Sequence, residues 1–215
     1  MKIEKNSKLV MIGDSVTDCG RALPVGEGLF GAEGNGYVNL VSAVLKSFHS
    51  DKNIRVVNMG NSGNTIRDLK GRWKSDVVDL KPDWVSIMIG VNDVWRQYDL
   101  PLQPETHVYL EEYKKTLEEL VISTVPLVKG MVLMTPYFIE HNENDAMRAT
   151  MDSYSKVVKE ISEKYNTLFV DTQGAFNEIL ENCYPASIAW DRVHPNTAGH
   201  MVIARAFLNA IEMKW

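Results

Sequence analysis

The sequence is poor in cysteine and in long hydrophobic runs. Its 215 residues contain two cysteines, Cys19 and Cys183, which cannot form a disulfide framework, so we expect a reducing compartment. No stretch approaches the roughly 18 apolar residues of a membrane span, and the polar residues 1–8 precede only a short apolar run. Neither a membrane association nor an export signal is predicted, and we therefore expect a cytoplasmic protein.

Positive charge is also in short supply. Lys and Arg number 23 against 28 Asp and Glu, which gives a formal net charge of -5. A nucleic-acid-binding surface needs clustered positive charge to displace counterions from phosphates, so nucleic acid is not an expected partner. With 45% hydrophobic residues the chain can bury a core, and no linker divides it. We expect residues 1–215 to form a single domain.

Short apolar runs alternate with longer segments of helical periodicity. The predicted strands are 9–12, 54–58, 84–89, 131–134 and 168–170. The predicted helices are 37–48, 66–80, 109–124, 146–165, 172–182 and 197–213. This alternation is typical of an α/β fold with a parallel sheet covered by helices on both faces. Ligands of such sheets bind beyond the carboxyl ends of the strands, and long irregular segments are expected at 16–36, 93–106, 135–145 and 183–196.

Polar residues follow the first three strands. Gly13-Asp14-Ser15 leaves a hydroxyl at the mouth of the sheet, and Gly60-Asn61-Ser62-Gly63 offers backbone N–H groups that suit a developing anion. Gly90-Val91-Asn92-Asp93 adds a side-chain amide donor. Each motif by itself is more typical of a turn or a helix cap than of a catalytic site.

Near the end of the chain a carboxylate precedes a histidine by three residues. In Asp191-Arg192-Val193-His194-Pro195, the proline pushes the backbone of His194 out of the helical region, so Asp191 can accept from one imidazole nitrogen while the other faces away. An acyl-transfer site needs a nucleophilic hydroxyl, a base, a group that orients the base and donors for the oxyanion. This chain supplies all four.

Taken in order, these motifs resemble those of the SGNH (GDSL-type) esterases and lipases, from Gly13 to His194. The longer segments 12–21, 82–99 and 189–195 are similar to those of the intracellular acetylxylan esterases of that family. The resemblance implies a flavodoxin-like, three-layer α/β/α sandwich with a five-stranded parallel sheet. Val16 stands where the motif has leucine, which affects packing and no catalytic group.

The resemblance also implies the roles of individual residues. Ser15 would be the nucleophile, His194 the general base and Asp191 the residue that orients the base. The oxyanion hole would comprise the backbone N–H of Ser15, the backbone N–H of Gly63 and the side-chain amide of Asn92. No metal and no cofactor are implied.

The implied function is a serine esterase that removes O-acetyl groups from acetylated xylo-oligosaccharides or another small acetyl ester. A short-chain acyl esterase, a lysophospholipase or a thioesterase of the same fold is the alternative, because fold and triad do not select the alcohol. A non-enzymatic carbohydrate-binding module would be favoured only by a broken triad, and the triad is intact.

Aromatic residues gather in the predicted strand-end loops, where their rings can stack on sugar faces. We expect substrate contacts from Trp95, Trp190 and Tyr184. These rings could equally pack loops together or lie in a subunit contact, since a homo-oligomer is expected.

Three other functional interpretations of the sequence are not supported by the position or spacing of the residues: a dinucleotide site, a metal site and a cysteine nucleophile. Residues 26–31 match the Gly-x-Gly-x-x-Gly dinucleotide fingerprint but do not directly follow a strand, so we expect a flexible loop beside the crevice. Asp14, Asp18 and Asp93 lack the alternation typical of metal sites. Cys19, unlike Ser15, does not sit at a strand end and is not expected to be a nucleophile. Spacing indicates no partner for the remaining histidines, His49, His107, His141 and His200, and packing or surface positions are expected for them.

Overall fold

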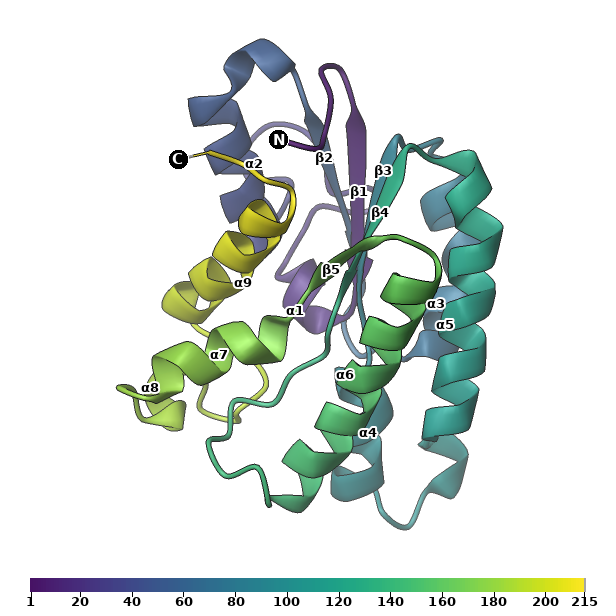
Figure 1. Cartoon of the computed structure of the whole chain (residues 1–215), viewed down its shortest axis with the longest axis vertical. Coiled ribbons are helices and arrows are strands. Elements are labelled where there is room, and N and C mark those ends of the chain that lie inside the picture. Colours follow the sequence, from purple (N-terminus) through teal and green to yellow (C-terminus); the bar gives the residue numbers. More distant parts are fainter. Residues whose placement is uncertain (215) are drawn as a thin grey trace.

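The structure is a computed structural model that describes residues 1–214. Within them, five parallel strands form one sheet in the order β2-β1-β3-β4-β5 (Figure 1). The strands are β1 (Lys8–Gly13), β2 (Arg55–Gly60), β3 (Trp84–Met88), β4 (Gly130–Met134) and β5 (Leu168–Val170). Gly13 at the end of β1 pairs with Gly60 of β2 and Met88 of β3. The first three strands therefore end in step, and the residues after them meet at one edge.

Helices cover both faces of the sheet. They are α1 (Ser15–Asp18), α2 (Tyr37–Phe48), α3 (Ile66–Trp73), α4 (Val91–Asp99), α5 (Leu110–Thr124), α6 (Ala146–Lys164), α7 (Thr172–Leu180), α8 (Pro185–Ile188) and α9 (Thr197–Ala210). A π-helical segment, Lys74–Val78, continues α3, and short 3₁₀ turns lie at Ser50–Lys52, Pro104–Thr106 and Val125–Leu127. The helices α2, α7 and α9 pack on one face and α3, α4, α5 and α6 on the other (Figure 1), so the fold is the expected three-layer α/β/α sandwich.

The alternation of side chains along β1 explains why both faces are covered. Leu9 and Met11 pack into the core formed with α2 and α9, whereas Val10 and Ile12 pack into the core formed with α3 and α5. Successive side chains of a strand point to opposite faces, and here both sets are apolar and buried. A sheet built from such strands needs a helical layer on each side.

The predicted strands and the six predicted helices are confirmed, but three helices lie in segments expected to be irregular. The first, α1, occupies the start of 16–36. Residues 93–106, expected to be irregular, begin with most of α4, which carries Val91, Val94, Trp95 and Tyr98 along one face. The β-branched and aromatic residues of this helix have low helical propensity, but burial of Val91 and Val94 outweighs it. The short helix α8 likewise lies inside the segment 183–196 that was expected to be a loop.

The glycine-rich segment 26–31 lies against the edge strand. Gly26 and Asn58 of β2 exchange two backbone hydrogen bonds, of 3.1 and 2.9 Å, in an isolated antiparallel bridge. The segment neither follows a strand nor opens a helix, so it lacks the context of a dinucleotide site. In the described part of the chain, no helix is both long enough and apolar enough to cross a membrane.

Candidate active site

Ser15 lies just beyond the carboxyl end of β1. In the sheet, β1 lies between β2 and β3, so the chain changes direction across the sheet here. Doubly wound sheets bind their ligands in the crevice at such a point. The buried Asp14 caps α1 by accepting a hydrogen bond from the Val16 N–H (3.0 Å). Only glycine fits at Gly60 of the neighbouring strand, because a Cβ there would lie 2.1 Å from the Asp18 nitrogen. The strand end is thus closed tightly around the turn that carries Ser15.

A continuous chain of hydrogen bonds joins the three predicted catalytic residues. The Ser15 hydroxyl lies 2.8 Å from His194 Nε2, and His194 Nδ1 lies 2.6 Å from Asp191 Oδ2. The other oxygen of Asp191 accepts the backbone N–H groups of Val193 (3.0 Å) and His194 (2.8 Å). Because an ionised carboxylate can only accept, Nδ1 carries the proton and Nε2 is free to accept from the hydroxyl.

The electrostatics of Asp191 keep it ionised. Partial burial raises the pKa of its carboxyl, but hydrogen bonds from the His194 ring and from two backbone N–H groups outweigh burial, and the pKa lies below its usual value. The pair is therefore suited to a base that becomes cationic during a reaction.

The three hydrogen-bond donors that the resemblance implies for the oxyanion hole are available in the structure. Within residues 1–214, the backbone N–H groups of Ser15 and Gly63 engage no acceptor. Gly63 has a φ of +82°, a conformation that favours glycine, and open space lies where a Cβ would stand. The buried Asn92 gives one amide proton to the Asn64 carbonyl oxygen (3.0 Å), and its Oδ1 accepts from Arg96 (3.4 Å). Its second amide proton is left for another acceptor.

Asp93, on α4, binds the start of α3 and is not arranged as a metal ligand. Its Oδ1 accepts the Ile66 N–H at the start of α3 (3.0 Å), whereas its buried Oδ2 has no hydrogen-bond partner among the described residues. Burial raises the pKa of this carboxyl to about 7, and burial likewise raises the pKa of Asp14 to about 6. In the described residues, no group of three or more His, Cys, Asp or Glu side chains is placed to hold a metal ion.

His200 has partners that its sequence position did not indicate. Its Nε2 lies 3.1 Å from Cys19 Sγ, and its Nδ1 accepts the Tyr37 N–H (3.2 Å). Burial lowers the pKa of His200 to about 4 and raises the pKa of Cys19 to about 11. Both groups are therefore neutral near pH 7, and the thiol is not an activated nucleophile.

Of the three aromatic residues expected to contact substrate, Trp95 has a ring contact with the triad residue His194. Its ring centroid lies 5.8 Å from that of His194, tilted by 58°, and the Arg96 guanidinium lies 5.0 Å from the Trp95 ring. Tyr184, at the start of α8, and Trp190, directly before Asp191, are 76% and 89% exposed. Their contact with substrate stays a prediction.

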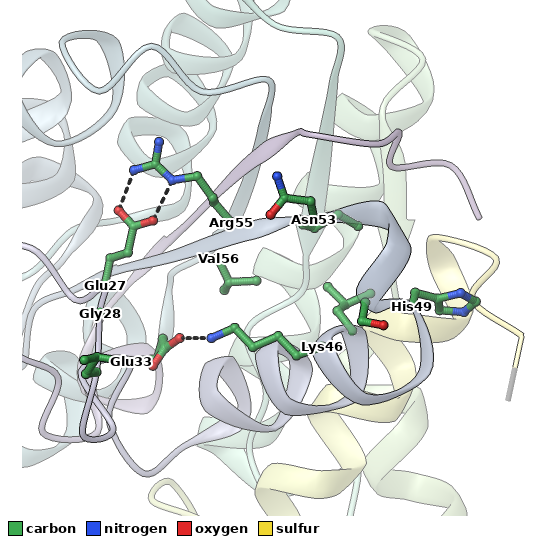
Figure 2. Close-up of a pocket in the computed structure, with 12 residues that line it drawn as sticks. Glu27, Gly28, Glu33, Lys46, His49, Asn53, Arg55 and Val56 are labelled. Atoms are coloured by element: carbon green, nitrogen blue, oxygen red, sulfur yellow. Dashed lines mark hydrogen bonds and ion pairs between the residues drawn. The ribbon is translucent and has the colours of Figure 1, made fainter.

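A separate pocket of about 420 Å³ lies at the other end of β2. In Figure 2, Arg55 points to Glu27 and Lys46 to Glu33, at 2.8 Å in both pairs. Residues at the amino end of β2 and the carboxyl end of α2 line it, so it is remote from the strand ends that carry Ser15. Because its cations are already paired with carboxylates, the pocket offers no free charge to a ligand.

Sequence reasoning missed the residues that hold the predicted site groups in place. Arg72 and Asp93 act through contacts with residues distant in the chain, which spacing alone does not reveal. Arg96 contacts Asn92 four residues before it, a pair that becomes visible only once α4 is known to be a helix. The helical face of Val91, Val94 and Trp95 is the signal that would have predicted α4 and with it the anchoring of Asn92.

Known proteins match this chain in sequence and in fold. The model of the GDSL-like lipase/acylhydrolase family matches residues 11–202. An acetylxylan esterase from Geobacillus stearothermophilus is 63% identical over 215 residues, which cover 100% of this chain and 98% of that protein. The crystal structure of Axe2, an acetylxylan esterase from the same organism, matches with a TM-score of 0.99 at 63% identity and covers 100% of this chain and 98% of its own.

Two further comparisons agree. LAE5, an α/β hydrolase from the metagenome of Lake Arreo, Spain, has a TM-score of 0.98 at 56% identity and covers 99% of this chain and 98% of its own. Solved catalytic mutants of Axe2, in which a serine, a histidine or an aspartate is replaced by alanine, match with a TM-score of 0.99. On the match over residues 11–202 and the identity over its whole length, this chain belongs to the GDSL-like lipase/acylhydrolase family.

Proposed function

We propose that this chain is a serine esterase that removes O-acetyl groups from acetylated xylo-oligosaccharides through an acetyl group carried on Ser15. The observation that carries the proposal is the uninterrupted hydrogen-bond chain from Ser15 through His194 to Asp191. Its substrate is taken from the 63% identity to an acetylxylan esterase.

Acylation begins with the proton of the Ser15 hydroxyl. His194 Nε2 takes this proton as Oγ attacks the acetyl carbonyl carbon, and the carbonyl oxygen becomes an oxyanion. Asp191 holds the imidazole in the tautomer that can accept the proton and stabilises the imidazolium that forms. When the bond to the sugar oxygen breaks, the imidazolium returns the proton to that oxygen, and the deacetylated sugar leaves.

Deacylation repeats the sequence with water. His194 takes a proton from the water that attacks the acetyl-Ser15 carbonyl, and the proton returns to Oγ as acetate leaves. In both steps the oxyanion accepts hydrogen bonds from the N–H groups of Ser15 and Gly63 and from the Asn92 amide. The Asn92 amide is held by the Asn64 carbonyl oxygen before substrate binds, so this donor needs little reorganisation when charge develops.

Three aromatic rings would supply contacts to the substrate. Trp95 lies beside His194 and would contact the acetyl group, while Trp190 and Tyr184 would stack on the sugar.

Large exposed apolar side chains, among them Phe30 at the surface of the glycine-rich segment, favour a homo-oligomer. In the described residues Cys19 and Cys183 are free thiols, which fits a cytoplasmic location.

Acetate release tests the proposal directly. The wild type is expected to release acetate from acetylated xylo-oligosaccharides, Ser15→Ala to release none above background, and Ser47→Ala, a control at a serine on α2 remote from the strand ends, to match the wild type. If the wild type releases no acetate, the proposed substrate is wrong. If Ser15→Ala keeps its activity, Ser15 is not the nucleophile.

The length of the acyl group separates this function from its alternative, a short-chain acyl esterase, lysophospholipase or thioesterase. We expect rates to fall from acetyl to butyryl to octanoyl esters of one alcohol, because the Trp95 ring, 5.8 Å from the His194 ring, would leave little room for a long acyl chain on that side of His194. Equal or rising rates would favour the alternative.

A further inference from the structure

Arg72 joins several polar groups behind the candidate active site. Its side chain, on α3, is 14% exposed. Nε donates to Asn64 Oδ1 (2.6 Å), Nη2 donates to the Gly13 carbonyl oxygen (2.9 Å), and Nη1 donates to the Met59 carbonyl oxygen (2.7 Å). Nη1 also donates to Asp76 Oδ2 (2.8 Å), which balances the charge of the guanidinium. One side chain therefore binds the ends of two strands and a loop.

The two strand-end carbonyls lie next to catalytic segments. Gly13 is the last residue of β1 and is two residues before Ser15. Met59 is next to last in β2, the strand that leads into the loop of Gly63. The guanidinium thus ties the backbone before one proposed oxyanion donor to the backbone before the other.

The third contact of Arg72 reaches the remaining donor. Asn64, whose side chain accepts from Arg72, directly follows Gly63. The Asn64 carbonyl oxygen accepts from the amide of Asn92, at 3.0 Å. A single residue therefore links the Gly63 loop to both Arg72 and Asn92.

We propose that Arg72 is a positioning residue that sets the spacing of the three oxyanion donors, the N–H groups of Ser15 and Gly63 and the amide of Asn92. This inference rests on the proposed esterase function and adds a residue to it. Arg72 does not touch the reacting atoms. A planar fork with donors in fixed directions can hold three acceptors at set distances, which the single ammonium of lysine cannot do.

Steady-state kinetics on 4-nitrophenyl acetate provide the first test. A displacement of donors by about 1 Å can cost about 100-fold in rate, so we expect Arg72→Ala to lower kcat by about 10- to 100-fold, with KM changed by less than about threefold. Arg72→Lys should restore only part of the loss. Full restoration by lysine, or an unchanged kcat in Arg72→Ala, would overturn the proposal.

Arg67→Ala is the matched control. Arg67 lies on the same helix and also binds a carboxylate, that of Glu112, and main-chain oxygens, those of Glu105 and His107, but none of these acceptors belongs to β1, β2 or the Gly63 loop. It should keep the wild-type kcat. Asn64→Ala leaves the bonds from Arg72 to the strand carbonyls in place and cuts only the link to the loop, so it should lower kcat in the same direction even if Arg72→Ala fails to fold.

A tetrahedral analogue separates positioning from a general loss of structure. Methylboronic acid adds to the Ser15 oxygen and places an oxygen in the oxyanion hole, whereas acetate binds as a planar product. The inhibition constant of methylboronic acid should rise with the loss of kcat/KM in Asn64→Ala and Arg72→Ala, while that of acetate changes by less than about threefold. Equal weakening of both inhibitors would indicate a merely structural role and overturn the proposal.

The same inhibitor distinguishes failure of this inference from failure of the proposed function. If Ser15→Ala binds methylboronic acid as tightly as the wild type, the esterase function itself fails. If binding depends on Ser15 but is unaffected in the Arg72 and Asn64 variants, the function stands and the role of Arg72 is overturned.

Discussion

Among single residues, Asn92 bears most directly on catalysis. It is buried, and contacts with Asn64 and Arg96 fix its amide before substrate arrives. Removing one oxyanion donor typically costs 10²- to 10³-fold in turnover, so we expect Asn92→Ala to lower kcat by about that factor, about 2.7 to 4 kcal/mol. The measurement is kcat on 4-nitrophenyl acetate. A kcat within about threefold of the wild type would exclude Asn92 from the oxyanion hole.

Asp93 makes stability depend on pH. Burial raises its pKa from 3.8 to about 7, so the folded protein holds a proton that the unfolded chain loses above about pH 4. The wild type therefore loses stability from this group as pH rises from about 4 to about 7, and the cost stays constant above that. Asp93→Asn removes this titration. As pH rises from about 4 to about 7, the free energy of unfolding of the variant should therefore increase relative to that of the wild type, by up to about 1.4 kcal/mol per pH unit.

Urea unfolding of both proteins at about pH 4, 5.5 and 8 measures the effect. The comparison between variant and wild type cancels carboxyl groups remote from Asp93. The raised pKa of the nearby Asp14 acts in the same direction as that of Asp93. A difference in stability that does not change across the three pH values would contradict the assignment to Asp93.

Whether a contact between two site residues could be predicted from the sequence depended on how far apart they are along the chain. Asp191 and His194 are three residues apart, so their contact follows from local geometry. Ser15 and His194 are 179 residues apart, and only the shared pattern of a family placed them in one site before the structure did. The spacing of Arg72 indicates only its pair with Asp76, four residues on, because its other bonds to the Met59 and Gly13 carbonyl oxygens join distant strands.

Helix α4 is the element on which sequence and structure differed most. It follows β3 through Gly90, whose φ of +129° turns the chain, and it carries both Asn92 and Trp95. The segment looked irregular because its polar and aromatic residues have low helical propensity. Tertiary packing decided its conformation, and a helix, unlike a loop, holds Asn92 and Trp95 at a fixed separation.

The N-cap of α7 gives a prediction at the scale of an element. The Asp171 side chain accepts the Gly174 N–H (2.8 Å), and loss of such a cap typically costs about 1 kcal/mol. Asp171→Ala should lower the free energy of unfolding by about that amount without changing kcat. Asp171→Asn, which keeps an acceptor oxygen, should retain most of the stability. Equal losses in both variants would show that the cap is not the cause.

At the scale of the whole molecule, the parallel sheet determines where the site lies. Three strands that end in step bring together Ser15, the Gly63 loop and α4, although their segments are far apart in sequence. The alternation of apolar runs predicted this sheet well, because buried parallel strands leave a strong pattern. The helix-to-sheet contacts that set exact distances leave no such pattern.

The net charge of the molecule gives a prediction that concerns the class of substrate. A neutral acetylated oligosaccharide is not steered by a charge of -5, so kcat/KM should change by less than about twofold between about 0.05 M and about 0.5 M NaCl. An anionic CoA ester would be repelled at low salt, and its kcat/KM would rise with added salt. A steep dependence for the acetylated oligosaccharide would contradict a neutral substrate.

The exposure of the triad has a consequence for the fate of the acyl group. The side chains of His194 and Asp191 are 46% and 36% exposed, so bulk water reaches the base directly. Water at about 55 M then outcompetes millimolar sugar hydroxyls for the acyl-enzyme, and the balance between hydrolysis and transfer to a second sugar falls on the side of hydrolysis. The open position also lets an acetyl group that projects from a rigid, bulky oligosaccharide reach the nucleophile without the sugar having to enter a closed cavity.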